Sequence, residues 1–167
     1  MKKAGVYRIG VLTLSDKGSQ GRRVDESGPV VRTMLDVVGS VTHASVLPDD
    51  LEAIVAILTS WADQEHLDLI VTTGGTGLTP RDVTPQATLQ VIDYEVPGMA
   101  EVMRMRSLEK TPHAMLSRAV AGVRRQTMII NLPGSPKAAR ENLEAVLPAL
   151  PHALAKLAGD PSDCAEK

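Results

Sequence analysis

The chain contains no phenylalanine, one tryptophan and two tyrosines among its 167 residues. Proteins that bind nucleic acids stack bases on aromatic rings and attract the phosphate backbone with positive charge. Here the rings are scarce and the formal net charge is −2. We therefore expect no nucleic-acid partner.

Cysteine is almost absent, since Cys164 is the only one and lies in the polar C-terminal sequence "GDPSDCAEK". One thiol cannot form a disulfide framework or a cysteine metal site within the chain. Long apolar runs are also missing: the run after "MKK" is interrupted by Arg8, and no stretch reaches the roughly 18 apolar residues of a membrane span. We expect a cytoplasmic protein with no membrane partner.

Apolar residues make up 43% of the sequence, enough for one compact domain, which we place at residues 1–160, followed by a polar tail at 161–167. Within it, apolar and β-branched runs predict strands at 7–15, 41–48 and 67–73. Two further runs flank "RRQ" near Arg124, and they predict either an edge hairpin or two neighbouring strands. The second of these runs, 127–131, is typical of a central strand.

Helical spacing of apolar residues alternates with these strands. The stripe from Val30 to Val38 predicts a helix with Gly39 as its left-handed cap. The clearest helix follows at 51–62, and Thr84 is expected to be the N-cap of another, with Pro85 at its first position. Ser135 is expected to cap the last helix, which the later prolines should break.

Strands that alternate with helices predict a three-layer α/β/α fold around a mostly parallel sheet, with a possible antiparallel edge hairpin. In such sheets, ligands bind beyond the carboxyl ends of the strands. The loops that follow strands are therefore the candidate site, and they cover residues 15–18, 48–50, 74–82 and 133–137.

The third of these loops, "GGTGLTPRD", is rich in glycine. Gly74, Gly75 and Gly77 would let backbone N–H groups converge on an anion, and the hydroxyls of Thr76 and Thr79 would add donors. The loop matches neither the P-loop nor the G-x-G-x-x-G fingerprint. On glycine content alone, a phosphate cradle and a tight strand-to-helix turn are equally good interpretations.

Two aspartates favour the cradle. Asp82 ends the glycine loop beside Arg81, and Asp49 lies in "LPDD" after another strand. Carboxylates repel a triphosphate unless a divalent cation such as Mg²⁺ lies between them. The alternatives stay open: Asp49 with Glu52 also fits a helix capping box, which local sequence favours, and Asp82 could bond turn amides two residues ahead.

The fourth loop, "NLPGSPKA", offers a helix N-terminus to an anion, and a bound anion would explain a lysine, Lys137, in the first turn. Ordinary capping by Ser135 explains the same residues. Ser117 and Arg118 in "LSRA" form either an anion clamp or a polar strand end. The four histidines show no metal-ligand spacing, and we assign them no chemistry.

The motifs "TTGGTGLTPRDVTPQAT", "VPGMAE", "MLSRAVAG" and "IINLPGSPKA", with "TLSD" and "LPDD", resemble the molybdenum-cofactor biosynthesis family of molybdopterin adenylyltransferases and their close relatives. The resemblance runs from about Arg8 to Leu157. It implies an α/β fold assembled as homotrimers or hexamers, which transfers AMP from ATP to the terminal phosphate of molybdopterin. Pyrophosphate leaves, and the adenylylated pterin passes to the molybdate-inserting enzyme.

By this resemblance, Asp49 and Asp82 are the essential acidic residues, and we hypothesise that they hold Mg²⁺ while loop amides align the α-phosphate. Arg81 and Lys137 are our candidates for neutralising phosphate charge. The residues expected to bind substrate or nucleotide are Ser15, Asp16, Gly74, Gly75, Thr76, Gly77, Thr79, Arg81, Ser117, Arg118, Asn131, Pro133, Gly134, Ser135 and Lys137.

Two departures from the family pattern are small: Gln86 stands where an acidic residue is frequent, and "PDD" replaces "PDE". Some family members bind pterin without convincing catalysis, so a non-catalytic scaffold protein of the same pathway is the alternative, although retention of both aspartates favours an enzyme. A domain of the molybdate-inserting enzyme itself is a remoter alternative, because that domain normally belongs to a much longer chain.

Overall fold

The computed structural model describes residues 7–162. Its strands form one sheet in the order β2-β1-β3-β6-β5-β4. The strands β1, β2, β3 and β6 run parallel, whereas β5 pairs antiparallel with both β6 and β4. The predicted mostly parallel sheet with an antiparallel edge is therefore confirmed. The strands are β1 (Tyr7–Leu14), β2 (Gly39–Leu47), β3 (Leu69–Thr73), β4 (Tyr94–Glu95), β5 (Ala121–Arg124) and β6 (Thr127–Leu132).

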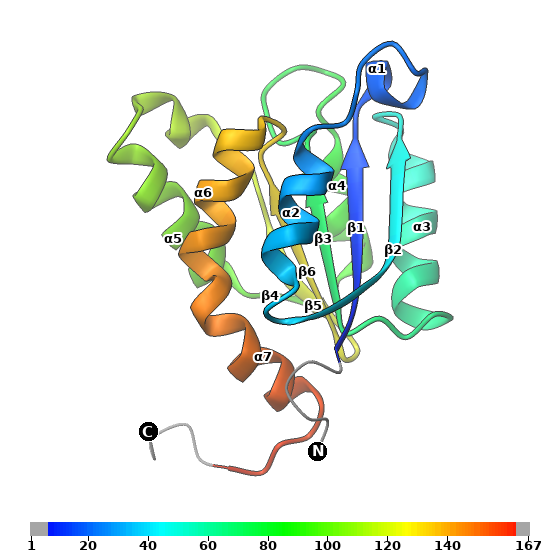
Figure 1. Ribbon diagram of the computed structural model, residues 1–167, viewed down its shortest axis with the longest axis vertical. Helices are drawn as coiled ribbons and strands as arrows, with labels where there is room; N and C mark the ends of the chain where they lie inside the picture. The colour runs from blue at the N-terminus through cyan, green and yellow to red at the C-terminus, as the bar shows by residue number, and fades with distance from the viewer. Residues whose placement is uncertain (1–6, 163–167) are drawn as a thin grey trace.

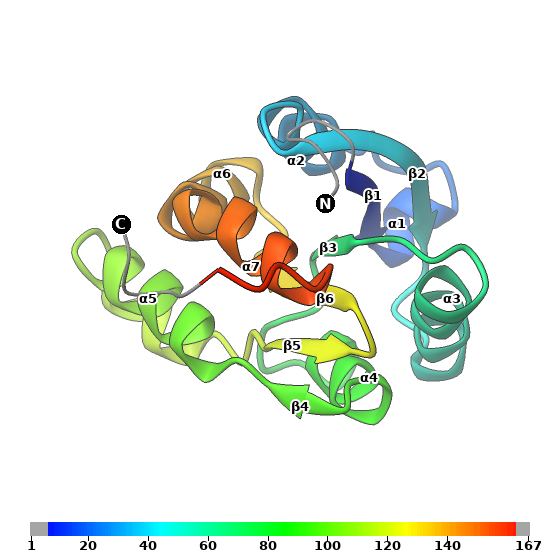
Figure 2. The same cartoon turned by 90° about the horizontal axis from the view of Figure 1, so that it is seen from below.

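Helices cover both faces of this sheet, as the sequence predicted. Figures 1 and 2 show α2, α5, α6 and α7 on one face, and α3 and α4 on the other. The α-helices are α1 (Asp16–Ser19), α2 (Ser27–Leu35), α3 (Leu51–Asp63), α4 (Thr84–Val91), α5 (Pro97–Leu108), α6 (Pro136–Val146) and α7 (Leu150–Leu157). Two 3₁₀ turns, η1 (Pro112–Leu116) and η2 (Leu147–Ala149), complete the described structure.

The core has two halves because successive strand side chains point to opposite faces. Val11, Val71 and Ile130 pack on the face covered by α2, α5, α6 and α7. Their sequence neighbours Leu12 and Ile70 pack on the other face, against α3 and α4. A strand covered on both sides is buried along its whole length, which is why β3 begins with three aliphatic residues and is entirely buried, its two threonines included.

Gly39 does not cap α2, and that prediction was wrong. The helix ends at Leu35, and Gly39 is the first residue of β2. It faces the first residue of β1 so closely that a Cβ atom at Gly39 would lie 2.3 Å from the carbonyl oxygen of Tyr7. The glycine is needed for strand approach rather than for helix termination.

The last helix is broken near its prolines, as the sequence predicted. Ser135 caps α6 as predicted, its Oγ accepting a hydrogen bond from the Ala138 amide at 3.1 Å. The helix ends before Pro148 and resumes as α7 around Pro151, because proline cannot donate to an existing helical ladder. Cys164 lies outside the described residues. No helix among residues 7–162 is both long enough and apolar enough to span a membrane.

Candidate active site

The carboxyl ends of β1, β2, β3 and β6 meet at one end of the sheet, the top in Figure 1. All four loops expected at this end come together there around a cavity of about 660 Å³. We call it the polar cavity. Its lining residues are Thr13, Leu14, Ser15, Gly18, Arg23, Val24, Asp25, Glu26, Ser27, Asp49, Thr73, Gly74, Gly75, Asp82, Gly134, Ser135 and Pro136.

Asp49 lines this cavity and does not cap α3, so the capping interpretation was wrong. The N-cap is its neighbour Asp50, whose Oδ1 accepts a hydrogen bond from the Ala53 amide at 2.9 Å. Asp49 instead faces Asp16: its Oδ2 accepts from the Asp16 amide at 3.2 Å, and its own amide donates to Asp16 Oδ1 at 3.0 Å.

The other oxygen of Asp49 is unusual. Oδ1 is buried and has no hydrogen-bond partner within residues 7–162. Burial, the largest cause, raises the pKa of Asp49, and the negative charges of Asp16 and Asp82 raise it further, while the Asp16 amide and Arg81 lower it. A buried carboxylate oxygen without a partner is costly. A cation or a donor placed at Oδ1 would offset that cost.

Asp82 enters the same cavity from the end of the glycine loop. Its Oδ2 accepts two hydrogen bonds from Thr79, one from the amide at 2.8 Å and one from Oγ1 at 2.6 Å. The turn interpretation was thus partly right, but the bonded amide lies three residues back rather than two ahead. Because both turn bonds go to Oδ2, they leave Oδ1 of Asp82 for another ligand.

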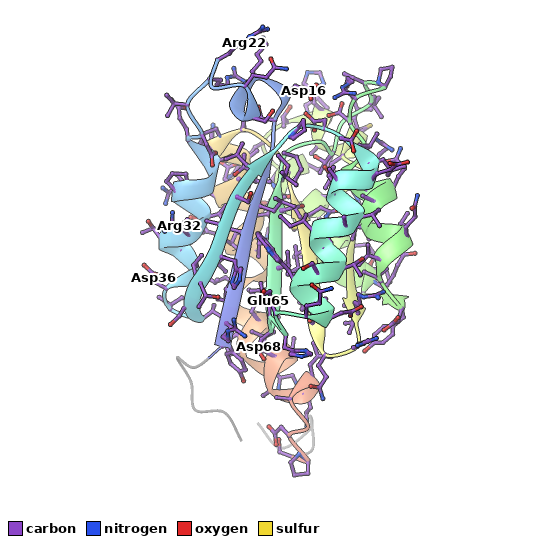
Figure 3. All side chains as sticks on the ribbon, turned by 90° about the vertical axis from the view of Figure 1, so that its right-hand side faces the viewer. Asp16, Arg22, Arg32, Asp36, Glu65 and Asp68 are labelled. Carbon is purple, nitrogen blue, oxygen red and sulfur yellow. The ribbon has the colours of Figure 1, made fainter. Side chains whose placement is uncertain are left out.

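Arg81 binds Asp16 through two parallel hydrogen bonds. Its Nε donates to Asp16 Oδ2 at 2.9 Å, and its Nη2 donates to Oδ1 at 2.7 Å. The hydrogen bond from Arg81 is the main reason that the pKa of Asp16 is lowered. The pair joins the start of α1 to the glycine loop, at the end of the sheet where Figure 3 shows Asp16.

The glycine loop requires its first two glycines. Gly74 and Gly75 have φ angles of 103° and 66°, a region that other residues rarely adopt. A Cβ atom at Gly75 would lie 2.9 Å from Asp49 Oδ1 and 2.2 Å from the hydroxyl of Thr84. The backbone of the loop therefore passes directly against the unpaired carboxylate oxygen.

We expected Thr84 to be the N-cap of α4, and that prediction was wrong. The N-cap is Val83, whose side chain makes no capping bond. Thr84 is the first helical residue, and its hydroxyl donates to the Gly74 carbonyl at 2.9 Å while its amide donates to that of Gly75 at 3.2 Å. These bonds to loop carbonyls, rather than to its own helix, fix the glycine loop.

Asp25 is a cavity residue that the sequence reasoning missed. Its Oδ2 accepts from the Thr13 hydroxyl of β1 at 2.8 Å, and its Oδ1 accepts from the Gly28 amide at 2.9 Å. Asp25 thereby ties the start of α2 to the sheet. The available signal was an aspartate shortly before Pro29, a typical helix start that we placed too late, at Val30.

Arg118 and Asn131 make hydrogen bonds to the glycine loop and within the core, respectively. Arg118 donates from Nε to the Gly77 carbonyl at 2.7 Å and from Nη2 to the Asp82 carbonyl at 2.5 Å, so it holds the glycine loop. Asn131 is fully buried, and its amide nitrogen donates to the hydroxyls of Thr72 and Thr88. The structure therefore places Asn131 in the core rather than at a ligand.

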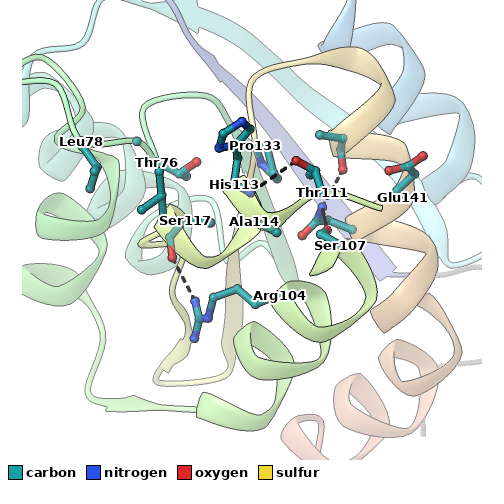
Figure 4. Close-up of a pocket in the computed structure, with 14 residues that line it drawn as sticks. Thr76, Leu78, Arg104, Ser107, Thr111, His113, Ala114, Ser117, Pro133 and Glu141 are labelled. Carbon is teal, nitrogen blue, oxygen red and sulfur yellow. Dashed lines mark hydrogen bonds between the residues drawn. The ribbon is translucent and has the colours of Figure 1, made fainter. Parts of the chain in front are cut away.

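A second pocket, of about 430 Å³, adjoins the glycine loop on its other side (Figure 4). We call it the apolar pocket, because Leu78, Leu116 and Pro133 contribute to its wall between α5, η1 and α6. Arg104 also lines the pocket and donates to the Ala119 carbonyl at 3.1 Å. The two pockets share one wall, since Gly74 and Gly75 line the polar cavity and the next two residues line the apolar pocket.

Residues 10–152 match the model of the family described as "Probable molybdopterin binding domain". The chain belongs to this family. The molybdopterin adenylyltransferase of Helicobacter pylori strain J99 is 43% identical over 162 residues, which are 95% of this chain and 92% of that protein. Gephyrin of Dictyostelium discoideum is 45% identical over 171 residues, but the chain spans only 24% of its length.

A comparison with a solved structure supports the assignment. The molybdopterin biosynthesis enzyme MoaB from Thermus thermophilus superposes with a TM-score of 0.88 at 54% sequence identity, covering 95% of this chain and all of that one. Nearly the whole of both chains therefore shares one fold.

In this molybdopterin-binding family member, the predicted site residues fall into three groups. Those that line the polar cavity are Ser15, Asp49, Gly74, Gly75, Asp82, Gly134 and Ser135. Those that line the apolar pocket are Thr76, Gly77, Ser117 and Pro133. Those that line neither are Asp16, Thr79, Arg81, Arg118, Asn131 and Lys137.

Proposed function

We propose that this protein transfers AMP from ATP to the terminal phosphate of molybdopterin and releases pyrophosphate, as a step in molybdenum-cofactor biosynthesis. Its relative in Helicobacter pylori is named molybdopterin adenylyltransferase, and the chain spans 92% of that relative. The observation that carries the proposal is the buried Oδ1 of Asp49, which has no hydrogen-bond partner within residues 7–162 and belongs to a residue that lines the same cavity as Asp82.

In this proposal, the polar cavity binds ATP and the apolar pocket binds the pterin. The polar cavity offers loop amides and two helix N-termini, those of α2 and α6, to the phosphates of ATP. We place the pterin in the apolar pocket, whose volume is about 430 Å³, with its phosphate directed at the glycine loop. The α-phosphate then lies against the loop, between the two pockets.

The reaction needs no strong base. A phosphate oxygen of molybdopterin, already ionised, attacks the α-phosphorus of ATP; the bond from that phosphorus to the β-phosphate oxygen breaks, and its electron pair leaves with pyrophosphate. The main barrier is repulsion between polyanions and the charge that develops on the leaving group. Positioning and charge neutralisation are therefore what the protein must supply.

The residues present fit Mg²⁺ as the neutralising cation. No group of three or more histidine, cysteine, aspartate or glutamate side chains in residues 7–162 is arranged to hold a metal. Mg²⁺ commonly takes only one or two carboxylates and completes its shell with water and substrate phosphates. Oδ1 of Asp49 and Oδ1 of Asp82 would supply those two ligands, and the bound ion would reduce the repulsion between carboxylates and ATP.

Three finer points complete the proposal. We place the protein in the cytoplasm, as a homotrimer or hexamer, and we expect its product to pass to the molybdate-inserting enzyme. The family resemblance supports the assembly and the downstream partner, and the single cysteine fits a reducing cytoplasm.

The test is to incubate the purified protein with ATP, Mg²⁺ and molybdopterin and to measure pyrophosphate and adenylylated pterin. We expect the two products in a one-to-one ratio, with neither formed when the pterin is omitted. Tight binding of molybdopterin without either product would instead indicate a non-catalytic scaffold, and would refute the proposed activity.

A further inference from the structure

The polar cavity has an unbalanced charge for a site that binds a polyanion. Four carboxylates line it, those of Asp25, Glu26, Asp49 and Asp82. Arg23 is the only basic residue in the same lining. A triphosphate in this cavity therefore meets one guanidinium that belongs to the cavity wall itself.

Other cations near the cavity have different roles. Arg81 is bound to Asp16 through two hydrogen bonds, and Arg118 donates to carbonyls of the glycine loop. Lys137 is exposed on α6 and does not line the cavity. The charges that the sequence suggested for phosphate binding are thus either engaged with protein or set outside.

Arg23 is also exposed, but it lines the cavity. Within residues 7–162, its side chain makes no hydrogen bond and no ion pair. Its backbone is nevertheless held on both sides: the Arg22 amide donates to the Lys17 carbonyl at 2.8 Å, and Asp25 bonds to both β1 and α2. A guanidinium without a partner, on an anchored segment of a cavity wall, is placed to bind an anion that enters the cavity.

The direction of the reaction identifies the phosphates that Arg23 meets. Attacking and leaving oxygens lie roughly in line in phosphoryl transfer. If molybdopterin attacks from the apolar pocket, the leaving pyrophosphate must extend from the glycine loop into the polar cavity. The α1–α2 segment that carries Arg23 forms part of that cavity's wall.

We propose that Arg23 binds the β- and γ-phosphates of ATP, the group that leaves as pyrophosphate, a role that rests on the proposed function. Arginine suits this role because its planar fork can donate two hydrogen bonds to one phosphate. The adjacent Arg22 serves as a matched control, because it does not line the cavity and Figure 3 shows it at the outer tip of the α1–α2 connection.

The experiment is isothermal titration of the wild-type protein, Arg23→Ala, Arg23→Lys and Arg22→Ala with ATP, inorganic pyrophosphate and AMP, each in the presence of Mg²⁺. For Arg23→Ala we expect affinity for ATP and pyrophosphate to fall about tenfold, as for loss of a charge-assisted hydrogen bond, with AMP affinity unchanged. Arg23→Lys should recover part of the loss, and Arg22→Ala should bind like the wild type.

Three outcomes would overturn the proposal. Equal pyrophosphate binding by wild type and Arg23→Ala would show that Arg23 makes no contact. An equal loss in Arg22→Ala would indicate a general effect of positive charge. A loss for AMP as large as that for ATP would place Arg23 at the α-phosphate. If the wild type bound neither ATP nor pyrophosphate, the proposed function would fail as well, a result distinct from the other three.

Discussion

Replacement of Asp49 by asparagine is expected to slow pterin-dependent pyrophosphate release by about 100-fold or more, while the protein stays folded and loses no thermal stability. Activity falls because the uncharged amide no longer supplies the Oδ1 carboxylate ligand. Stability is retained because the carboxylate is buried, unpaired at Oδ1 and repelled by Asp16 and Asp82, so that its removal relieves an unfavourable interaction. Steady-state kinetics and thermal denaturation measure the two quantities.

The adjacent Asp50 provides the control. It caps α3 through its side chain, and asparagine caps a helix about as well as aspartate. Asp50→Asn should therefore keep both the rate and the stability of the wild type. A wild-type rate in Asp49→Asn would refute the role assigned to that carboxylate, and a loss of rate in both variants would point to a general effect of charge at this loop.

Replacement of Gly74 by alanine is expected to destabilise the fold by about 3 kcal/mol or more. Two costs combine: φ is 103°, and a Cβ atom would lie 2.3 Å from the carbonyl oxygen of Leu14, a backbone atom that cannot move aside easily. Equilibrium unfolding in urea measures the loss of free energy. Because Gly74 lines the polar cavity, ATP binding should also weaken in whatever fraction remains folded.

The variant Gly21→Ala serves as the control that separates backbone strain from the steric clash. Gly21 also has a positive φ, 69°, but a Cβ atom there would have nothing within 4 Å. Gly21→Ala should therefore cost only the strain of the left-handed conformation, about 1 kcal/mol. If Gly74→Ala were no more harmful than Gly21→Ala, the close packing of the glycine loop on β1 would be refuted.

Much of the fold could be predicted because burial on both faces leaves a strong pattern. The segment that contains β3 is a nearly continuous apolar run, and the loop after it is rich in glycine, so strand and loop were evident together. The meeting of four loops at one end also follows from parallel strands, without any side-chain detail. Asp82 was therefore placed correctly at the rim by topology.

The finer assignments depended on contacts that sequence does not encode locally. Asp49 and Asp50 are adjacent carboxylates, and which one caps α3 is decided by the residue at which the helix begins. Arg81 finds its partner, Asp16, 65 residues away. Asn131 was expected at the ligand because it ends an apolar strand before a glycine turn, but the alternation along β6 turns its side chain toward Thr88 in the core. Each of these outcomes was set by tertiary packing.

The most direct test of a site built on two carboxylates is pyrophosphate release by Asp82→Asn, measured in a single turnover with ATP, Mg²⁺ and molybdopterin. Asparagine retains an oxygen that can accept the Thr79 hydrogen bonds, so the loop should keep its shape while the charge is lost. We expect release to slow by about 100-fold or more in a protein that unfolds at the wild-type temperature. Release at the wild-type rate from that folded variant would contradict the paired-carboxylate site.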